Sequence, residues 1–510
     1  MRHIFTQQNI KYILFIFLAS VWGSVCFVLP DFIDNPHEGL RGVLALVVYV
    51  GALGVVQFLF LYAISTYHLL AAVLYPIYAI IGAGLAFYRV VYHVSLTPLI
   101  IDVTLHTNAE EALGVMSWQL WAWIMFNVLI AVLLIIYRWK KIIISHPWIH
   151  LLASILLLGI YSQCNGRLRQ SIRQRYPANI VYVGKEYILS KQDQTERRVP
   201  SFQSSHSDEI QLIFILGEAV RADHLGLNGY QQNTTPRLGK EENLISFPNV
   251  YSPYTHTTAS IPYIITRADS AHEDRTIKET SFIPILKQCG YRTYWISNQD
   301  LGGSFAYFPS ECDSSIFVNK GKTDYVFHPW LDEDLLPIIQ EIIQIKEVRQ
   351  AYMIHLIGSH WYYNNHVPQE QQVYQPTTTN RLITANTKEQ IIHSYDNTIL
   401  YMDSVVEEII SYFRKENAIL IFLSDHSESL GEEGRWLHAS DAEEQKHPAC
   451  FIWYSDRYQQ CYPHKIAAAQ KNRTTVYNTD FLFYSILSAV GIEGQDYDVC
   501  RDVFANPLTN

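Results

Sequence analysis

Charged side chains are scarce in this sequence of 510 residues. Lys, Arg, Asp and Glu make up 17% of it, against about 25% in an ordinary soluble protein. The deficit lies in residues 1–163, which hold seven basic and six acidic residues, so the remainder carries a net charge of −11. This excludes a wholly soluble protein, and the lack of a basic face at domain scale argues against a nucleic-acid binder. None of the seven cysteines forms a C-x-x-C pair, which argues against a zinc site built from Cys.

Long charge-free runs occupy the first third instead. Residues 12–30, 42–88, 112–137 and 142–163 carry no charge. A membrane span needs about 20 apolar residues, so the run of 47 residues holds two spans that break at the polar cluster 65–68. A cleaved signal peptide is the alternative for the first run, but four more spans follow and no clear A-x-A site is present. The sequence predicts a five-helix transmembrane domain over 1–164, with spans at about 12–31, 42–64, 69–91, 118–137 and 147–163.

The basic residues of this domain predict its orientation. With a cytoplasmic N-terminus, the inside segments hold five Lys or Arg and the outside loops hold two, in agreement with the positive-inside rule. An odd number of spans then places everything after residue 164 across the membrane, in the periplasm of a bacterium. Within the segment 165–208, four arginines close to the last span, Arg167, Arg169, Arg173 and Arg175, are interleaved with apolar residues, which favours an interfacial helix on anionic headgroups. A solvated linker is the alternative.

Residues 209–510 have a different pattern: short apolar runs alternate with longer segments of helical periodicity. This is typical of an α/β domain with a largely parallel sheet. Four of the expected strands run into polar residues, namely Glu218, Asn298, His360 and the pair Asp425-His426. Since open α/β sheets bind ligands beyond the carboxyl ends of their strands, we expect these side chains at one rim. The expected strands are 211–216, 293–296, 352–356, 419–423 and 450–454, and the expected helices are 281–288, 334–345, 387–414 and 477–490.

Two carboxylates and an imidazole at this rim indicate a metal site. Glu218, Asp425 and His426 offer oxygen and nitrogen ligands that suit Zn²⁺, and Mn²⁺ or Mg²⁺ less well. His360 and His438 would complete this site or form a second one. Alone, Asp425-His426 would be a strand-end turn, but the other strand ends favour the metal site.

The segment 254–262 (YTHTTASIP) supplies candidate nucleophiles. A proline is well tolerated in the first turn of a helix, so we expect a helix start here. A hydroxyl at such a start lies near amide dipoles that favour an alkoxide and receive phosphate oxygens, and a bound metal would stabilise the alkoxide. The residues alone leave Thr255, Thr257, Thr258 and Ser260 open, and a helix cap without catalytic role is the alternative.

Five motifs in order, spread over nearly the whole chain, resemble phosphoethanolamine transferases. They are GEAVRADHLGLNGY (217–230), THTTASIP (255–262), WISNQ (295–299), HLIGSH (355–360) and SDHSESLGEEGRWLHA (424–439). The resemblance implies a multi-pass inner-membrane enzyme with five spans and a periplasmic α/β/α sulfatase-like domain of the alkaline phosphatase superfamily over 209–510. It implies transfer of phosphoethanolamine from phosphatidylethanolamine to an envelope glycolipid, lipid A or the lipopolysaccharide core, through a phospho-threonine intermediate.

The resemblance also implies roles for single residues at the rim. Thr257 would be the nucleophile, and one tightly bound zinc ion would be held by Glu218, Thr257, Asp425 and His426. Two further histidines would bind the phosphoryl group or a second zinc ion and protonate the leaving oxygen, namely His360 and His438.

Substrate contacts are implied in both domains. Asn298 matches the family's substrate-loop asparagine, and HTNAEEA (106–112) resembles the family's E-T-N-x-x-E-A stretch. Thr107 and Glu111 would then hold the ethanolamine head of the donor lipid, with a helix-capping pair as the alternative.

Two departures from the family pattern stand out. Members carry a Lys shortly after the loop asparagine, whereas residues 299–319 hold no Lys or Arg, which puts binding of the second phosphate in doubt. Members often flank the nucleophile loop with a disulfide, where this chain has Pro253 and Tyr263. In an oxidising compartment, four other cysteines could form bridges, for which we expect 289–312 and 461–500.

Three alternatives remain open. A glycerol-phosphate transferase would use phosphatidylglycerol on the same fold. A membrane-anchored phosphodiesterase or sulfatase is another, although the sulfatase motif Cys/Ser-x-Pro-x-Arg is not visible. A non-catalytic lipid- or glycan-binding protein is disfavoured by the full set of Glu218, Thr257, Asp425 and His426.

Overall fold

The computed structural model describes residues 7–33, 37–91, 94–106, 117–163, 166–192, 197–204, 208–300, 307–322, 328–345, 349–381, 383–440 and 442–505. The chain divides into two compact units, and each is described by itself. The helical unit comprises residues 1–189 with the later segments 321–328 and 379–385, and the α/β unit comprises residues 190–320, 329–378 and 386–510.

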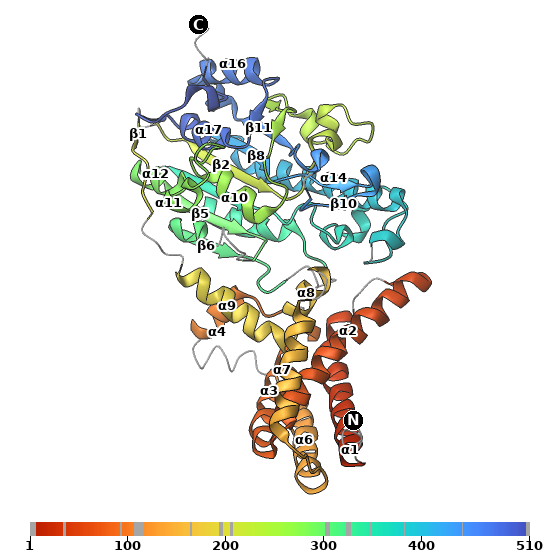
Figure 1. The fold of residues 1–510 in the computed structure, drawn as a ribbon. Coiled ribbons are helices and arrows are strands. Elements are labelled where there is room, and N and C mark those ends of the chain that lie inside the picture. The colour runs from red at the N-terminus through yellow and green to blue at the C-terminus, as the bar shows by residue number, and fades with distance from the viewer. Residues whose placement is uncertain are drawn as a thin grey trace. The chain divides into compact units, whose positions relative to one another are not determined.

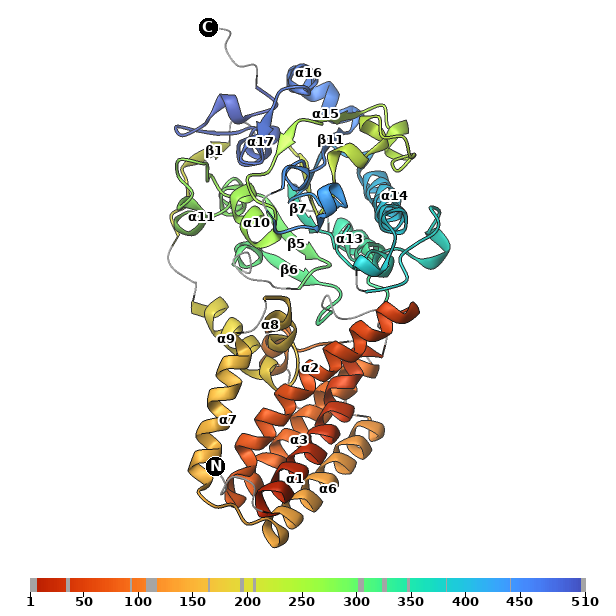
Figure 2. The ribbon, with the colours of Figure 1, turned by 45° about the vertical axis from the view of Figure 1, so that its right-hand side comes forward.

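Five apolar helices form most of the helical unit (Figure 2). Four of them are long and apolar enough to cross a bilayer, over Gln8–Phe32, Gly39–Ser65, His68–Val91 and Trp118–Lys141. The fifth, Pro147–Ser162, has 16 residues and spans about 24 Å, against a hydrocarbon core of about 30 Å. The expectation of five spans is therefore confirmed for four helices and not for the fifth. The helices are α1 (Gln7–Gly23, continued by η1, Ser24–Val28, and η2, Leu29–Phe32), α2 (Gly39–Ser65), α3 (His68–Val91), α6 (Trp118–Lys141) and α7 (Pro147–Ser162).

The outer surface of this unit is apolar. Val48, Leu69 and Leu156 are among many aliphatic side chains that remain largely exposed, as expected where lipid rather than water is the solvent. The chain is therefore a multi-pass membrane protein.

Several polar side chains in the interior of the helical unit are hydrogen-bonded to neighbouring segments. Arg138 donates to the carbonyl oxygens of Ser65 at 2.7 Å, Thr66 at 2.9 Å and Ile142 at 2.8 Å. The first two carbonyls lie at the end of α2, where the polar break between spans was predicted. Asn127 accepts a hydrogen bond from the Trp22 indole at 2.9 Å. Since lipid offers no hydrogen bonds, these pairs stabilise the bundle.

The arginine-rich stretch after α7 is helical rather than an extended linker. It forms α8 (Gly166–Arg173) and α9 (Ala178–Gln192), and a shorter helix, α4 (Pro98–His106), precedes α6. Two candidate substrate residues that follow α4, Thr107 and Glu111, lie outside the described residues.

A sheet of seven strands forms the centre of the α/β unit (Figure 1), in the order β3-β11-β8-β2-β7-β5-β6. The four strands β8, β2, β7 and β5 are parallel neighbours, and β11 pairs with β8 and β3 in antiparallel fashion. The predicted strands and the largely parallel sheet are confirmed, while the short edge strands β3 and β6 were missed. The strands are β3 (Leu244–Ser246), β11 (Cys450–Tyr454), β8 (Ala418–Ser424), β2 (Gln211–Gly217), β7 (Gln350–His355), β5 (Arg292–Ser297) and β6 (Ser314–Phe317).

Helices cover both faces of this sheet, so the unit has the expected α/β/α layers. Successive side chains of a strand point to opposite faces, and the strands here are apolar on both faces, as in parallel sheets generally. Met353 joins the core beneath α10, α12 and α17, while the neighbouring Tyr352 packs against Phe413 of α14, with ring centroids 5.2 Å apart. The helices are α10 (Thr257–Ile265), α11 (Arg275–Lys278), α12 (Ile283–Gln288), α13 (Leu336–Ile343), α14 (Lys388–Phe413), α15 (Asp456–Cys461), α16 (Pro463–Asn472) and α17 (Phe481–Ala489).

Three two-stranded ribbons complete the unit. They are β1 (Phe202–Ser204) with β13 (Ile492–Gly494), β9 (Ser429–Leu430) with β10 (Trp436–Leu437), and β4 (Val250–Tyr251) with β12 (Tyr477–Asn478). None of them was predicted, because two or three residues carry too little periodicity to be recognised.

The predicted disulfides are wrong. Cys289, Cys312, Cys461 and Cys500 are all free thiols in the structure. The spacing of cysteines along a chain does not determine which of them meet in space, and this pairing had no other basis. Cys450 is buried in β11, as expected.

Candidate active site

The carboxyl ends of four parallel strands bring the predicted polar residues to one edge of the sheet. Gly217 of β2 is in register with Ser424 of β8, and Leu216 is in register with His355 of β7. His355 is in turn in register with Ser297 of β5. The residues that follow these positions, Glu218, Asp425-His426, Asn298 and the loop to His360, therefore emerge at the same level.

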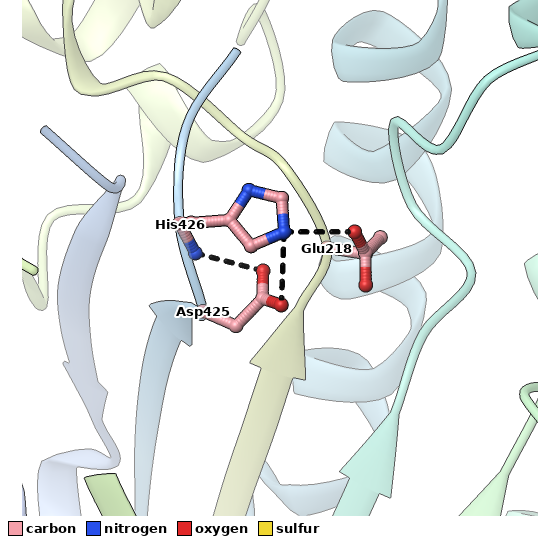
Figure 3. Close-up of side chains that lie close together, drawn as sticks. All are labelled: Glu218, Asp425 and His426. Carbon is pink, nitrogen blue, oxygen red and sulfur yellow. Dashed lines mark hydrogen bonds and ion pairs between the residues drawn. The ribbon is translucent and has the colours of Figure 1, made fainter. Parts of the chain in front are cut away.

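Glu218, Asp425 and His426 form one compact cluster (Figure 3), with one potential ligand atom of each within 4.8 Å of the others. The His426 Nε2 atom lies 3.4 Å from Glu218 Oε1 and 3.4 Å from Asp425 Oδ2. All three side chains are fully buried. Two carboxylate oxygens and an imidazole nitrogen at this separation are a donor set that suits Zn²⁺.

Hydrogen bonds around the cluster determine which atoms face inward. His426 Nδ1 lies 3.0 Å from the Ser427 carbonyl oxygen, so Nδ1 carries the proton and the lone pair of Nε2 points at the two carboxylates. Asp425 Oδ1 accepts from the amides of Ala219 and His426. Glu218 Oε1 and Asp425 Oδ2 have no hydrogen-bond partner among the described residues. Three lone pairs facing one another are repulsive unless a cation lies between them, so the residues fit a metal ion.

The pKa values of the three side chains are shifted by burial and by the repulsion between the two carboxylates. Burial raises the pKa of Glu218 well above its ordinary value, and the Asp425 charge raises it further. Burial also raises the pKa of Asp425 to about 6 and lowers the pKa of His426 well below its usual range. A divalent cation would favour the charged carboxylates and the neutral imidazole.

Thr257 is the first residue of α10 and contacts this cluster. Its Oγ1 donates to Glu218 Oε2 at 3.1 Å and lies 3.4 Å from His426 Nε2. The sequence placed Pro262 in the first turn, but the helix begins at Thr257 and contains Pro262 at its sixth position. The expected helix start within 254–262 is therefore confirmed, while the expected place of Pro262 in the first turn is wrong.

The other candidate nucleophiles are placed differently. Thr255 is buried, and its carbonyl accepts from the Ala439 amide at 2.8 Å. Thr258 is exposed. The Ser260 hydroxyl is fully buried and has no hydrogen-bond partner among the described residues. Thr257 is therefore the only one of the four for which the described residues show a contact with the carboxylate–histidine cluster.

His438 and His360 adjoin the cluster. The His438 ring lies 4.5 Å from the His426 ring and 5.9 Å from the His360 ring, centroid to centroid. His438 Nδ1 lies 2.6 Å from Glu428 Oε1, and the Tyr363 hydroxyl donates to the other oxygen of Glu428. Burial lowers the pKa of His438, but the hydrogen bond and charge of Glu428 outweigh it, so the pKa is raised.

Asn298 is buried behind the rim and its amide is fully engaged. Its Nδ2 donates to Asp332 Oδ1 at 2.8 Å and to the Leu331 carbonyl at 3.0 Å. Its Oδ1 accepts from Asn319 at 2.5 Å and from the Trp330 indole at 3.1 Å. Only 1% of Asn298 is exposed, so its side chain lies behind the rim, and its predicted contact with substrate stays a prediction.

The loop after β7 packs closely against the backbone of Glu218, which follows β2. Gly358 has φ of +51°, and a Cβ there would lie 2.9 Å from the Glu218 carbonyl oxygen. Asp332 accepts from the amides of Ile357 and Gly358 at 2.9 and 3.0 Å. Only glycine allows both this conformation and this approach.

Sequence reasoning missed Gln299, Glu428 and Asp332. Gln299 lies inside the motif at 295–299 and Glu428 inside the motif at 424–439, so their positions close to Asn298 and His426 were the available signal. Asp332 lies in no quoted motif, and only the folded chain brings it beneath Asn298.

Comparison with known proteins defines the class first. A sulfatase family model matches residues 211–492, more than half of the chain, so this is a sulfatase-fold protein with a helical membrane unit. A second family model, described as phosphoethanolamine transferase EptA/EptB, matches residues 53–176. The chain belongs to the phosphoethanolamine transferase family.

Relatives agree with this assignment over the full length. Phosphoethanolamine transferase EptA of Salmonella typhimurium is 27% identical, with 96% of this chain and 95% of the relative covered. The integral membrane lipooligosaccharide phosphoethanolamine transferase A of Neisseria meningitidis shares the fold over 96% of this chain and 98% of its own, at 20% identity and a TM-score of 0.54. The periplasmic domain of EptC from Escherichia coli, solved in complex with Zn, shares the fold over 62% of this chain and 92% of its own, at 22% identity and a TM-score of 0.56.

Proposed function

We propose that this protein transfers phosphoethanolamine from phosphatidylethanolamine to an envelope glycolipid, lipid A or the lipopolysaccharide core, through a phosphoethanolamine-threonine intermediate on Thr257. The observation that carries the proposal is the Thr257 hydroxyl, held 3.1 Å from Glu218 and 3.4 Å from His426 at the start of a helix. Membership of the family supports the transfer, and the name of the neisserial relative supports a glycolipid acceptor.

The proposed location is a bacterial inner membrane with the α/β unit in the periplasm. Four spans, a short fifth apolar helix and the distribution of basic residues support it, as does the periplasmic origin of the EptC domain. In this arrangement the membrane domain covers 1–164, the interfacial segment 165–208 and the catalytic domain 209–510. Both the donor lipid and the glycolipid acceptor would then be reached from the membrane surface.

The proposed cofactor is one zinc ion held by Glu218 Oε1, Asp425 Oδ2, His426 Nε2 and Thr257 Oγ1. When bound, zinc favours the deprotonated form of a hydroxyl ligand and polarises phosphoryl oxygens. His360 and His438 are left to bind the phosphoryl group or a second zinc ion. The inward lone pairs of the cluster and the zinc complex of EptC support this choice.

The first displacement joins Thr257 to the lipid phosphorus. Thr257 gives its proton to Glu218 Oε2 as its Oγ1 forms the new P–O bond, and the bond from phosphorus to the diacylglycerol oxygen breaks. An imidazole of His360 or His438 gives a proton to that oxygen, so diacylglycerol leaves neutral. The N-terminal dipole of α10 stabilises the negative phosphoryl oxygens.

The second displacement reverses these roles. An acceptor phosphate or hydroxyl oxygen attacks the phosphorus of the intermediate and loses any proton to the same imidazole. The bond from phosphorus to Thr257 Oγ1 breaks, and the threonine hydroxyl recovers its proton from Glu218. The acceptor leaves with one added phosphoethanolamine.

Substitution of Thr257 tests the proposal. Full-length protein in vesicles of phosphatidylethanolamine should release diacylglycerol. Thr257→Ala should reduce this release by at least about a thousandfold, because it removes the one candidate hydroxyl for which the described residues show a contact with the cluster. Thr258→Ala, one residue further along the exposed helix start, is the matched control and should retain activity. Wild-type release by Thr257→Ala would refute the assignment.

Mass spectrometry of envelope glycolipids identifies the acceptor. Cells with the active protein should gain one phosphoethanolamine on lipid A or on a core sugar, and cells with Thr257→Ala should not. Release of diacylglycerol from phosphatidylglycerol instead would favour a glycerol-phosphate transferase.

A further inference from the structure

Gln299 makes two side-chain hydrogen bonds at the rim, and one of them reaches Glu218. Its Nε2 donates to Glu218 Oε2 at 3.0 Å and to the Leu356 carbonyl oxygen at 2.8 Å. The Leu356 carbonyl oxygen can only accept, so this atom must be the amide nitrogen, and its two hydrogens serve the two partners. The side chain thereby connects the ends of β5, β7 and β2.

The backbone of Gln299 is itself fixed. Its amide donates to Ser297 Oγ at 3.1 Å, and the Ser297 hydroxyl donates to the Gln299 carbonyl oxygen at 2.8 Å. Behind it, the neighbouring Asn298 is buried and bound to Asp332. The amide of Gln299 is therefore presented from a rigid loop.

The two oxygens of Glu218 are consequently different. Oε2 accepts from both Gln299 and Thr257, whereas Oε1 has no hydrogen-bond partner among the described residues and lies 3.4 Å from His426 Nε2. Without the Gln299 donor, the carboxylate could rotate and exchange its oxygens. Outer partners of this kind fix the orientation of metal ligands.

We propose that Gln299 is a positioning residue of the metal site: it holds Glu218 with one oxygen toward the metal ion and the other toward the Thr257 hydroxyl. This rests on the proposed zinc site. The contribution acts through Glu218, because Gln299 donates to no other member of the cluster.

Zinc affinity of the full-length protein in detergent tests this role without an activity assay. The protein is stripped with a chelator, and zinc binding is measured by competition with a chromophoric chelator. Gln299→Met keeps the length of the side chain and removes the donor, so zinc should bind about 10–100-fold more weakly. Gln344→Met, on an exposed glutamine after α13, is the matched control and should change the affinity by less than about twofold.

A second background separates positioning from general damage. In Glu218→Gln, the substitution Gln299→Met should weaken zinc binding by no more than about twofold, because the residue through which it acts has been replaced. An equal loss in both backgrounds, or no loss in the wild-type background, would overturn the proposal. Should Gln299→Met not fold, Gln299→Asn, whose shorter amide cannot reach both acceptors, takes its place with the same expectation.

The same zinc titration distinguishes a failure of the proposed metal site from a failure of the role of Gln299. If the wild-type protein binds no zinc, the proposed metal site is wrong and Gln299 loses its role with it. If the wild type binds zinc and Gln299→Met binds it equally well, only the role of Gln299 is refuted.

Discussion

Two sets of buried polar side chains, one in each unit of this molecule, serve different purposes. In the helical unit, Arg138 and Asn127 are hydrogen-bonded to groups on neighbouring segments. At the strand ends of the α/β unit, Glu218, Asp425 and His426 instead turn lone pairs toward one another. A buried polar group with hydrogen-bond partners stabilises the fold. Several lone pairs that the fold holds facing one another lower its stability and provide a site for a cation. The comparison predicts which substitutions should affect activity and which should affect folding.

The largest effect is expected at the cluster. Asp425→Asn removes one charged ligand but keeps an oxygen for the amides of Ala219 and His426, so activity should fall by at least about a thousandfold, or about 4 kcal/mol in the barrier. The zinc-free variant should unfold at the same or a higher temperature than the zinc-free wild type, because one of two mutually repelling buried charges is gone. A large drop in the unfolding temperature would contradict the contrast between the units.

The pH dependence of the stability of the zinc-free protein tests the same repulsion. The pKa of Asp425 is raised by burial to about 6 in the folded protein, from an ordinary 3.8. A raised pKa contributes stability that is complete below the unfolded value and is lost as the pH rises through the folded one. The wild type should therefore become less stable between pH values of about 4 and 7, and Asp425→Asn should lose less over the same range in thermal unfolding.

The next effect is expected in the helical unit, on stability. Arg138→Met removes the donor to three carbonyl oxygens at the end of α2 and after α6, which should destabilise the protein by about 3 kcal/mol. Lys140→Met, on the exposed side of the same helix end, should change stability by less than about 0.5 kcal/mol. Thermal unfolding in detergent measures both, and equal stability of the two variants would show that the Arg138 contacts contribute nothing.

The smallest effect is expected at Gly358, where the loop after β7 packs against Glu218. Gly358→Ala and Gly290→Ala both place alanine at a positive φ, +51° and +86°, but only at Gly358 would the new Cβ meet Glu218, at 2.9 Å from its carbonyl oxygen. Gly290→Ala should lose about 1 kcal/mol of stability, and Gly358→Ala should lose more, because its new Cβ also clashes with the backbone of Glu218. Only Gly358→Ala should also lose activity, by about 10–100-fold, since it displaces Glu218 of the proposed zinc site. Equal activity of the two variants would mean that the Glu218 backbone tolerates the shift.

Much of the fold could be predicted from local patterns. Charge-free runs of sufficient length revealed four spans, because the bilayer sets a minimum length of apolar helix. Continuous apolar runs revealed β2, β5, β7 and β8, because parallel strands are buried on both faces. The antiparallel strand β11 was revealed in the same way because all five of its residues are buried. The fifth span was predicted from a run of 22 uncharged residues, 142–163, but the helix begins only at Pro147.

The candidate site was predictable in part. Glu218 and Asp425-His426 stand directly after strands, so topology alone brings them together. Thr257 could be chosen among four hydroxyls only by resemblance or by the contacts of the folded chain. The support by Gln299, Glu428 and Asp332 depends on loop conformations that no local pattern encodes.

The sequence by itself determined that this chain enters a membrane, that a largely parallel sheet follows, and that acidic and imidazole groups end its strands. These properties depend on residue type and spacing, and they act over a few turns or strands. Only the tertiary structure decided that the oxygen and nitrogen atoms face one another, that Asn298 is buried behind them, and that the cysteines stay apart. Such outcomes depend on distances between residues far apart in the chain, and those distances arise from packing of the whole domain.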